Sequence, residues 1–288
     1  MGTSDYAAAG PGAAGASPSG PFLSKSDILR RNNVRLMGQG PRTLVLCNGF
    51  GYNQRLWHHL APALAAQHRV VLFDHVGSGE SNRQAYDPQK YDSLQGYAHD
   101  LIEICAALEL REAVLIGHSV GAIIALLAAS AAPRYFGRVV LLTPSPCYVN
   151  EPGYYGGFER ENLQQVLESM QADYHRWAYQ FADLIMGDAN SPVLSEELGQ
   201  HFGQADAAIA QQFARVTFFS DNRPDVPRLH LPTLVVLCRE DVVAPAEVGH
   251  YLLAHLPQAR LVTLRTTGHC PHLSAPLETL AAIQSFIS

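Results

Sequence analysis

Residues 113–129 read AVLIGHSVGAIIALLAA, and this stretch decides the fold. An apolar run typical of a buried strand leads directly to Gly117, and a small-residue run typical of a helix follows Ser119. Ser119 is the centre of a G-x-S-x-G pattern, which at a sharp strand-to-helix turn exposes a nucleophilic serine hydroxyl. The start of the following helix directs main-chain N–H groups at developing negative charge. The segment therefore predicts a strand, a tight turn carrying a nucleophile, and a helix.

Apolar runs of the same kind recur along the chain, separated by longer segments with helical character. The predicted strands are residues 43–47, 69–73, 113–116, 139–142, 233–237 and 259–264. Continuous apolar runs are typical of strands that are buried on both faces of a parallel sheet. Helices are predicted between them, for example over residues 97–108 and 121–131. This alternation predicts an α/β fold with a mostly parallel, doubly wound sheet.

Residues 144–220 interrupt this alternation. No strand pattern is evident there, and apolar residues recur at helical spacing, as at Leu163, Val166, Leu167 and Met170. A helical insertion of this kind is typical of a lid over a binding site. Residues 1–23 are rich in Ala, Gly, Ser and Pro, which predicts a disordered tail. We therefore expect a core of residues 24–143 and 221–288, with a lid of residues 144–220 inserted into it.

A serine nucleophile needs a base, and candidates for the base and its orienting acid follow Ser119 in the chain. In folds with this serine turn the acid comes next and the histidine last, as in the α/β-hydrolase fold. Asp241 lies just beyond the predicted strand 233–237, and His269 follows the last predicted strand after a glycine. Glu240 is the neighbouring alternative acid, but adjacent residues of an extended segment face opposite ways. We therefore predict a Ser119, Asp241, His269 triad.

Two further features concern the surroundings of this triad. The main-chain N–H of Val120, directly after the nucleophile, and that of Phe50, in the loop after the first core strand, are predicted to form the oxyanion hole. His272 is the nearest rival of His269, and the H-x-x-H spacing is compatible with a metal pair. No third ligand is found at a suitable spacing, so neither a metal nor a cofactor is predicted.

Composition excludes several classes of function. The net charge is −6, and no run of Lys and Arg is present, so neither nucleic acid nor an anionic membrane is an expected partner. No stretch reaches the roughly 18 apolar residues that a transmembrane helix needs. Five widely spaced cysteines without a C-x-x-C pair favour a reducing compartment. We expect a cytoplasmic protein.

Several motifs together resemble the bacterial RsbQ family, with the plant strigolactone and karrikin receptors as its relatives. The likeness runs from about residue 26 to the C-terminus, and its motifs are 48–51 NGFG, 73–79 FDHVGSG, 117–121 GHSVG, 144–148 PSPCY, 154–159 YYGGFE, 218–221 FFSD and 268–272 GHCPH. The lid motifs YYGGFE and FFSD are the more specific ones, because many hydrolases share the serine turn. One departure is Asn48, where relatives often have His or Pro; we expect it to tune the loop without abolishing the oxyanion hole.

The resemblance implies a V-shaped lid of four helices over an apolar pocket that takes a small hydrophobic ligand. It also implies a regulator of stress signalling that acts with a PAS-containing sensor phosphatase. We predict a serine hydrolase, carboxylesterase-like, acting on a small hydrophobic ester or lactone. A receptor with slow or no turnover, acting through a protein partner, is the alternative. Aromatic lid residues are predicted to contact the substrate, namely Phe158, Trp177 and Phe181.

Overall fold

The computed structural model describes residues 23–187 and 192–288. Seven strands form one sheet in the order β1-β3-β2-β4-β5-β6-β7. All neighbouring strands are parallel except β1, which is antiparallel to β3. In chain order the strands are β1 (Arg35–Met37), β2 (Thr43–Cys47), β3 (Arg69–Leu72), β4 (Ala113–His118), β5 (Phe136–Leu142), β6 (Thr233–Glu240) and β7 (Ala259–Thr267).

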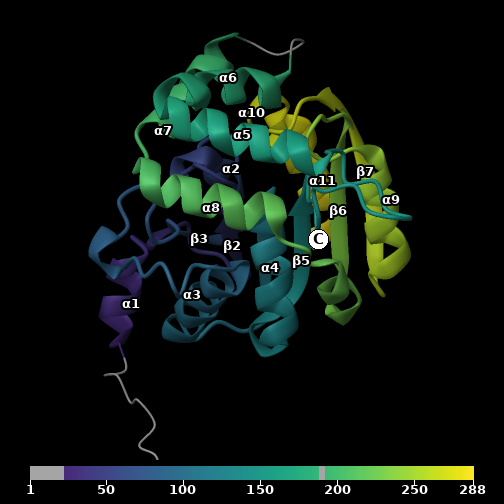
Figure 1. The fold of residues 1–288 in the computed structure, drawn as a ribbon. Coiled ribbons are helices and arrows are strands. Elements are labelled where there is room, and N and C mark those ends of the chain that lie inside the picture. The colour runs from purple at the N-terminus through teal and green to yellow at the C-terminus, as the bar shows by residue number, and fades with distance from the viewer. Residues whose placement is uncertain (1–22, 188–191) are drawn as a thin grey trace, which may run out of the picture.

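Helices cover both faces of this sheet (Figure 1). Helices α3, α4 and α9 pack on one face, and α2 and α11 pack on the other. The helices outside residues 144–220 are α1 (Lys25–Arg31), α2 (Ala61–Ala65), α3 (Leu94–Ala107), α4 (Val120–Ala131), α9 (Ala246–His255), α10 (Pro271–Ser274) and α11 (Pro276–Ile287). The predicted mostly parallel, doubly wound sheet is therefore confirmed.

The six predicted strands are all present, and several extend beyond the predicted limits. Strand β5 begins three residues earlier than predicted, at Phe136, and β6 continues to Glu240. The sequence analysis missed β1, because its three residues are exposed and have no apolar pattern. It forms an edge strand through pairing with β3, a long-range contact that local sequence does not encode. The predicted tail, residues 1–23, lies outside the described residues except for Leu23.

Between β5 and β6 the chain forms a group of helices that lies across one end of the sheet (Figure 1). These helices are α5 (Arg160–Ala172), α6 (Tyr174–Met186), α7 (Pro192–Gly203) and α8 (Ala207–Phe219). Helix α6 packs against α7, and α5 packs against both α6 and α8. Buried side chains at helical spacing, such as Leu163, Leu167 and Met170 in α5, join the hydrophobic core. This group of helices covers the end of the sheet at which the parallel strands finish.

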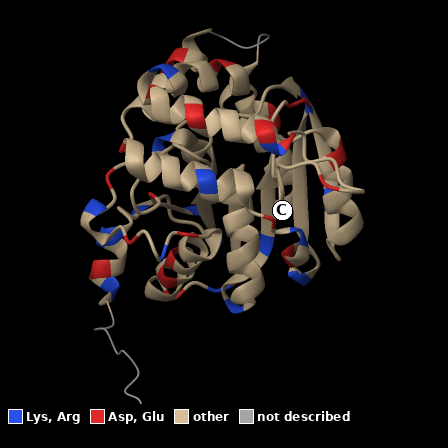
Figure 2. Cartoon of the chain, viewed as in Figure 1, with Lys and Arg blue, Asp and Glu red and all other residues tan. Residues whose placement is uncertain are grey.

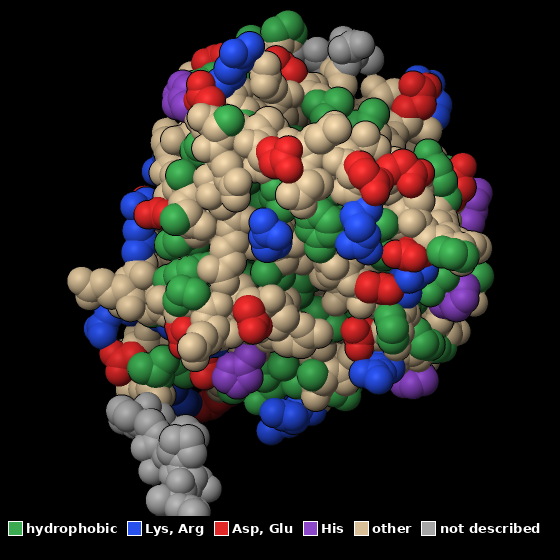
Figure 3. Space-filling view, viewed as in Figure 1, with side chains coloured by type: hydrophobic (Ala, Val, Ile, Leu, Met, Phe, Trp, Pro, Cys, Tyr) green, Lys and Arg blue, Asp and Glu red, His purple; other side chains and the backbone are tan. Residues whose placement is uncertain are grey.

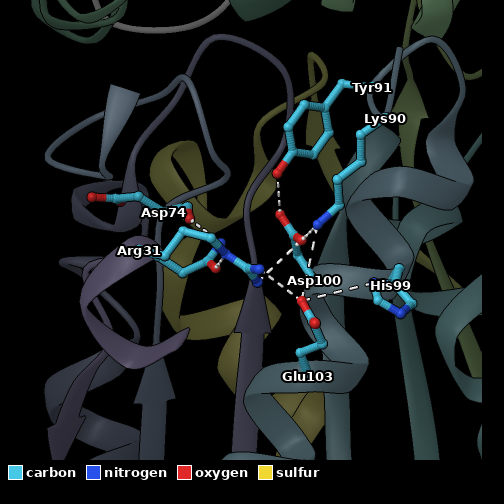
Figure 4. A network of polar contacts seen from close by, with 8 residues as sticks. Arg31, Asp74, Lys90, Tyr91, His99, Asp100 and Glu103 are labelled. Atoms are coloured by element: carbon cyan, nitrogen blue, oxygen red, sulfur yellow. Dashed lines mark hydrogen bonds and ion pairs between the residues drawn. The ribbon is translucent and has the colours of Figure 1, made fainter. Parts of the chain in front are cut away.

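Acidic and basic residues are interspersed along the chain (Figure 2), and their side chains are scattered over the face seen in Figure 3. A buried ion-pair network ties the N-terminal helix to the core, as Figure 4 shows. In it the Asp100 carboxylate of α3 lies 3.1 Å from the Arg31 guanidinium of α1 and accepts a 2.7 Å hydrogen bond from the Tyr91 hydroxyl. Lys90 also pairs with Asp100.

In the part of the chain that the structure describes, no helix has the length and apolar character to span a membrane.

Candidate active site

Ser119 occupies the tight turn between β4 and α4. Its backbone has φ 54° and ψ −125°, in a region that non-glycine residues rarely adopt. Glycines on both sides allow the close approach that this turn needs. A Cβ on Gly117 would lie 2.4 Å from the Gly121 carbonyl oxygen, and one on Gly121 would lie 2.2 Å from the Asn48 carbonyl oxygen. Gly117 is therefore required by the close approach of the main chain at the start of α4, and Gly121 by the packing of the turn against the end of β2.

Asp241 and His269 complete a continuous chain of hydrogen bonds to this serine. His269 Nε2 lies 2.7 Å from Ser119 Oγ, and His269 Nδ1 lies 2.8 Å from Asp241 Oδ2. Because an ionised carboxylate only accepts hydrogen bonds, Nδ1 carries the proton and Nε2 is free to accept from the serine. The other carboxylate oxygen of Asp241 accepts from the N–H groups of Val243 and Ala244. The structure therefore brings the three predicted residues together.

The rival residues lie elsewhere. The Glu240 side chain is exposed and pairs with Arg239 at 3.4 Å, whereas the Asp241 side chain is buried against His269. His272 is buried behind the site, with its ring 4.3 Å from that of His118 and neither nitrogen in a hydrogen bond among the described residues. Burial lowers the pKa of His272 well below its usual value, so the ring is neutral.

The two N–H groups predicted for the oxyanion hole lie at the ends of β2 and β4. Val120 is the first residue of α4, where main-chain N–H groups have no partner within the helix. Phe50 follows β2, and neither its N–H nor that of Val120 is in a hydrogen bond within residues 23–187 and 192–288. The Asn48 side chain anchors this loop, since it donates to the Phe73 carbonyl and accepts from the Trp57 indole. The departure at Asn48 thus stabilises the loop without involving the Phe50 N–H.

A cavity of about 20 Å³ lies over Ser119, close to the volume that a single water needs. The lid contributes an aromatic wall to it, with Phe181 from α6, Phe202 from α7 and Phe218 from α8 among the lining residues. The Thr217 hydroxyl, also in the lining, has no hydrogen-bond partner among the described residues. The Phe202 ring packs so closely on Gly51 that a Cβ there would lie 2.2 Å from it.

The three lid residues predicted to contact substrate lie at different distances from this cavity. Phe181 lines it. Trp177 lies behind Phe181, with the two rings stacked 4.9 Å apart, and does not line the cavity. Phe158 does not line it either, because its main chain is hydrogen-bonded to Tyr148 and Asn150 in the segment before α5. The aromatic character on which the prediction rested did not distinguish these three positions.

The sequence analysis missed the residues that hold the main chain of His269. Its N–H donates to the Ile185 carbonyl at the end of α6, 2.7 Å away, so the lid contacts the histidine directly. Its carbonyl oxygen lies 2.9 Å from His118 Nε2 and 3.0 Å from Thr143 Oγ1. The sequence analysis also missed Tyr148, which lines the cavity and whose pKa is raised by burial, so its phenol stays protonated. Tyr148 lies in the PSPCY motif and His118 in the GHSVG motif, so both carried a signal in the sequence.

The described residues contain one cluster with the spacing of metal ligands, formed by His99, Asp100 and Glu103. Its two carboxylates already pair with Arg31 and Lys90, as seen in Figure 4. These side-chain cations neutralise the charge that would attract a metal ion. His269 and His272 do not belong to this cluster.

Comparisons with known proteins agree with the fold described above. The profile of the "Alpha/beta hydrolase family" matches residues 44–283. A karrikin insensitive 2 receptor of Petunia hybrida is 36% identical over 246 residues, which cover 85% of this chain and 91% of the receptor. A strigolactone esterase of Arabidopsis thaliana is 36% identical over 257 residues, covering 89% of this chain and 96% of the esterase. The structure of a hydrolase from Oleispira antarctica is similar with a TM-score of 0.90 and 37% identity, covering 92% of this chain and 97% of that one.

Proposed function

This chain belongs to the alpha/beta hydrolase family, and from that premise we propose that it is a serine hydrolase of a small hydrophobic ester or lactone. Its resemblance to the strigolactone and karrikin receptors is confirmed by relatives that carry those names. One observation carries the proposal. An uninterrupted chain of hydrogen bonds joins the Asp241 carboxylate, the His269 imidazole and the Ser119 hydroxyl beneath a small cavity.

In the proposed reaction Ser119 Oγ attacks the carbonyl carbon while His269 Nε2 takes the hydroxyl proton. Asp241 holds the imidazole in the required tautomer and stabilises the imidazolium that forms. The N–H groups of Val120 and Phe50 donate to the oxyanion of the tetrahedral intermediate. His269 then passes the proton to the leaving alkoxide, and water hydrolyses the acyl-enzyme by the same steps in reverse order. For a lactone, ring opening leaves the alcohol attached to the acyl group, and hydrolysis of the acyl-enzyme releases a single hydroxy acid.

The size and lining of this cavity limit what the substrate can be. A volume of about 20 Å³ leaves no room for a large acyl group unless lid side chains move. Its lining is mainly aromatic, with no Lys, Arg, Asp or Glu among the lining residues, which disfavours a charged substrate. The lid contacts the reacting region through Phe181, Phe202 and Phe218, so substrate binding requires these rings to repack. A compact, uncharged ester or lactone fits these limits best.

A regulatory role, with slow or single turnover, is the second candidate. The hydrogen bond from the His269 N–H to the Ile185 carbonyl favours it, because it links the state of the catalytic base to the position of α6. We propose that the protein is an RsbQ-like regulator whose lid surface is read by a protein partner, a PAS-containing sensor phosphatase. The five cysteines are free and buried, which supports a cytoplasmic location.

Stopped-flow hydrolysis of p-nitrophenyl acetate by the wild type and by Ser119→Ala tests the catalytic proposal. We expect sustained p-nitrophenol release by the wild type and a loss of at least about 10³-fold in the folded variant. A stoichiometric burst followed by very slow release would favour the regulatory candidate. Unchanged hydrolysis by a folded Ser119→Ala protein would contradict both.

The partner proposal needs a separate test. Leu184 lies in α6 of the lid and is half exposed. Leu277 lies in α11, outside the lid, and is also exposed, so it serves as the control. We expect Leu184→Asp to weaken capture of a PAS-containing phosphatase while p-nitrophenyl acetate hydrolysis is unchanged, and Leu277→Asp to leave both unchanged. Equal capture of the two variants would count against a lid-directed partner.

A further inference from the structure

Two side chains from the core converge on one main-chain oxygen of the catalytic base. His118 is the last residue of β4, and Thr143 directly follows β5. His118 Nε2 and Thr143 Oγ1 lie 2.9 Å and 3.0 Å from the His269 carbonyl oxygen. Both side chains are buried. Neighbouring strand ends thus direct two donors at the same acceptor.

The His118 ring is held in one tautomer. A carbonyl oxygen only accepts hydrogen bonds, so Nε2 must carry the proton. Burial, with His269 nearby, lowers the pKa of His118 to about 3, so the ring is neutral. Nδ1 is therefore unprotonated and can only accept a hydrogen bond. This atom faces Gly49, where an added Cβ would lie 2.5 Å away, and it has no hydrogen-bond partner among the described residues. His118 is therefore a fixed donor that also packs against the loop carrying the Phe50 N–H.

Thr143 has a strained backbone. Its φ is 45°, which is unfavourable for a β-branched residue. Such strain persists only where the surroundings impose it, and it is concentrated at functional sites. Here the Thr143 N–H donates to the Val236 carbonyl at 2.7 Å while the hydroxyl reaches the His269 carbonyl. The strained conformation thus lets one residue bond to β6 and to the catalytic loop at once.

We propose that His118 and Thr143 are positioning residues that hold the main-chain carbonyl of His269. Held in this way, the imidazole stays aligned between the Asp241 carboxylate and the Ser119 hydroxyl. Through its contact with Gly49, His118 also sets the separation between the oxyanion loop and the base. The inference rests on the proposed hydrolase function and names residues outside its triad and oxyanion hole.

Paired substitutions separate the hydrogen bond from the volume of each side chain. His118→Gln keeps an N–H donor at a similar reach, whereas His118→Met keeps the bulk without a donor. Thr143→Ser and Thr143→Val form the corresponding pair. With p-nitrophenyl acetate we expect His118→Met and Thr143→Val each to lower kcat about tenfold with KM changed less than about twofold. His118→Gln and Thr143→Ser should stay within about threefold of the wild type.

The double variant His118→Met/Thr143→Val should lose more than the product of the two single losses, because it leaves the carbonyl without a donor. Thr233→Val is the matched control. Thr233 is also buried and donates to a main-chain carbonyl, that of Leu231, but it lies at the opposite end of β6 from Asp241. A kcat for His118→Gln as low as that for His118→Met, or an equal loss in Thr233→Val, would overturn the proposal.

A spectroscopic measurement keeps this test independent of turnover. The proton shared by His269 Nδ1 and Asp241 gives a downfield proton NMR resonance while the imidazole is aligned. We expect it in the wild type and in His118→Gln, and expect it to be lost or broadened in His118→Met. An unchanged resonance in His118→Met would contradict the positioning role. Absence of Ser119-dependent hydrolysis in the wild type would instead contradict the proposed function.

Discussion

The core and the lid form opposite walls of one small cavity, and they are built in different ways. On the core side Asp241 and His269 are fixed by hydrogen bonds, which include those from the main-chain N–H groups of Val243 and Ala244 to the Asp241 carboxylate. On the lid side Phe181, Phe202 and Phe218 meet through ring packing at centroid distances near 6 Å. Hydrogen bonds fix atoms in position, whereas aromatic packing tolerates rearrangement. The difference teaches that the core fixes the geometry of the triad, whereas the lid rings can rearrange around the cavity.

The largest effect should come from replacing Asp241, the acid of the triad. Asp241→Asn keeps the shape of the side chain but removes the acceptor that fixes the His269 tautomer. We expect kcat for p-nitrophenyl acetate to fall by about 10³–10⁴-fold with the fold intact. Glu240→Gln, at the exposed neighbouring position, is the matched control and should retain wild-type activity. Similar losses in both variants would refute the assignment of Asp241.

A smaller effect should follow from enlarging the cavity on the side that the lid forms. Phe202→Leu removes a ring that packs on Phe50 at 6.0 Å and on Gly51. We expect kcat/KM for esters with bulkier acyl groups to rise about tenfold relative to p-nitrophenyl acetate. Phe136→Leu, at the start of β5, serves as the control because Phe136 is also buried but does not line the cavity. The same change in preference in both variants would mean that Phe202 does not restrict the substrate.

The third prediction concerns the stability of the core rather than the reaction rate. It follows from histidines that are buried on the core side. Burial lowers the pKa of His75, His118 and His272 from the usual 6.5. Below pH 6.5 the unfolded chain therefore binds protons that the folded chain does not, so the free energy of unfolding falls as pH is lowered. Each of these histidines should contribute a slope of up to about 1.4 kcal/mol per pH unit.

Urea unfolding at pH 7, 6 and 5 measures this slope. His118→Gln should reduce this slope by the contribution of one histidine, because two of the three buried histidines remain in that variant. A free energy of unfolding that is constant between pH 7 and pH 5 would contradict the burial of these rings in the neutral form.

The contrast between core and lid also explains how far sequence reasoning reached. The core elements carry local signals: uninterrupted apolar runs for strands buried on both faces, and glycines where the turn at Ser119 allows no Cβ. The lid was predicted as helical, but helical spacing identifies only the buried face of each helix. It does not encode which residues or which cavity that face contacts. Phe158, Trp177 and Phe181 were therefore indistinguishable in the sequence, although only Phe181 lines the cavity.

The sequence by itself determined the sheet, the inserted helices and the identity of the three residues that meet at the site. These follow from chain order and from local patterns that act over a few residues. The tertiary structure alone decided the size of the cavity and the contacts of the His269 main chain. Those contacts join β4, β5 and α6 to a loop that lies about 80 to 150 residues away in the chain. Hydrogen bonds over such separations depend on how the strands are ordered in the sheet, which no local pattern records.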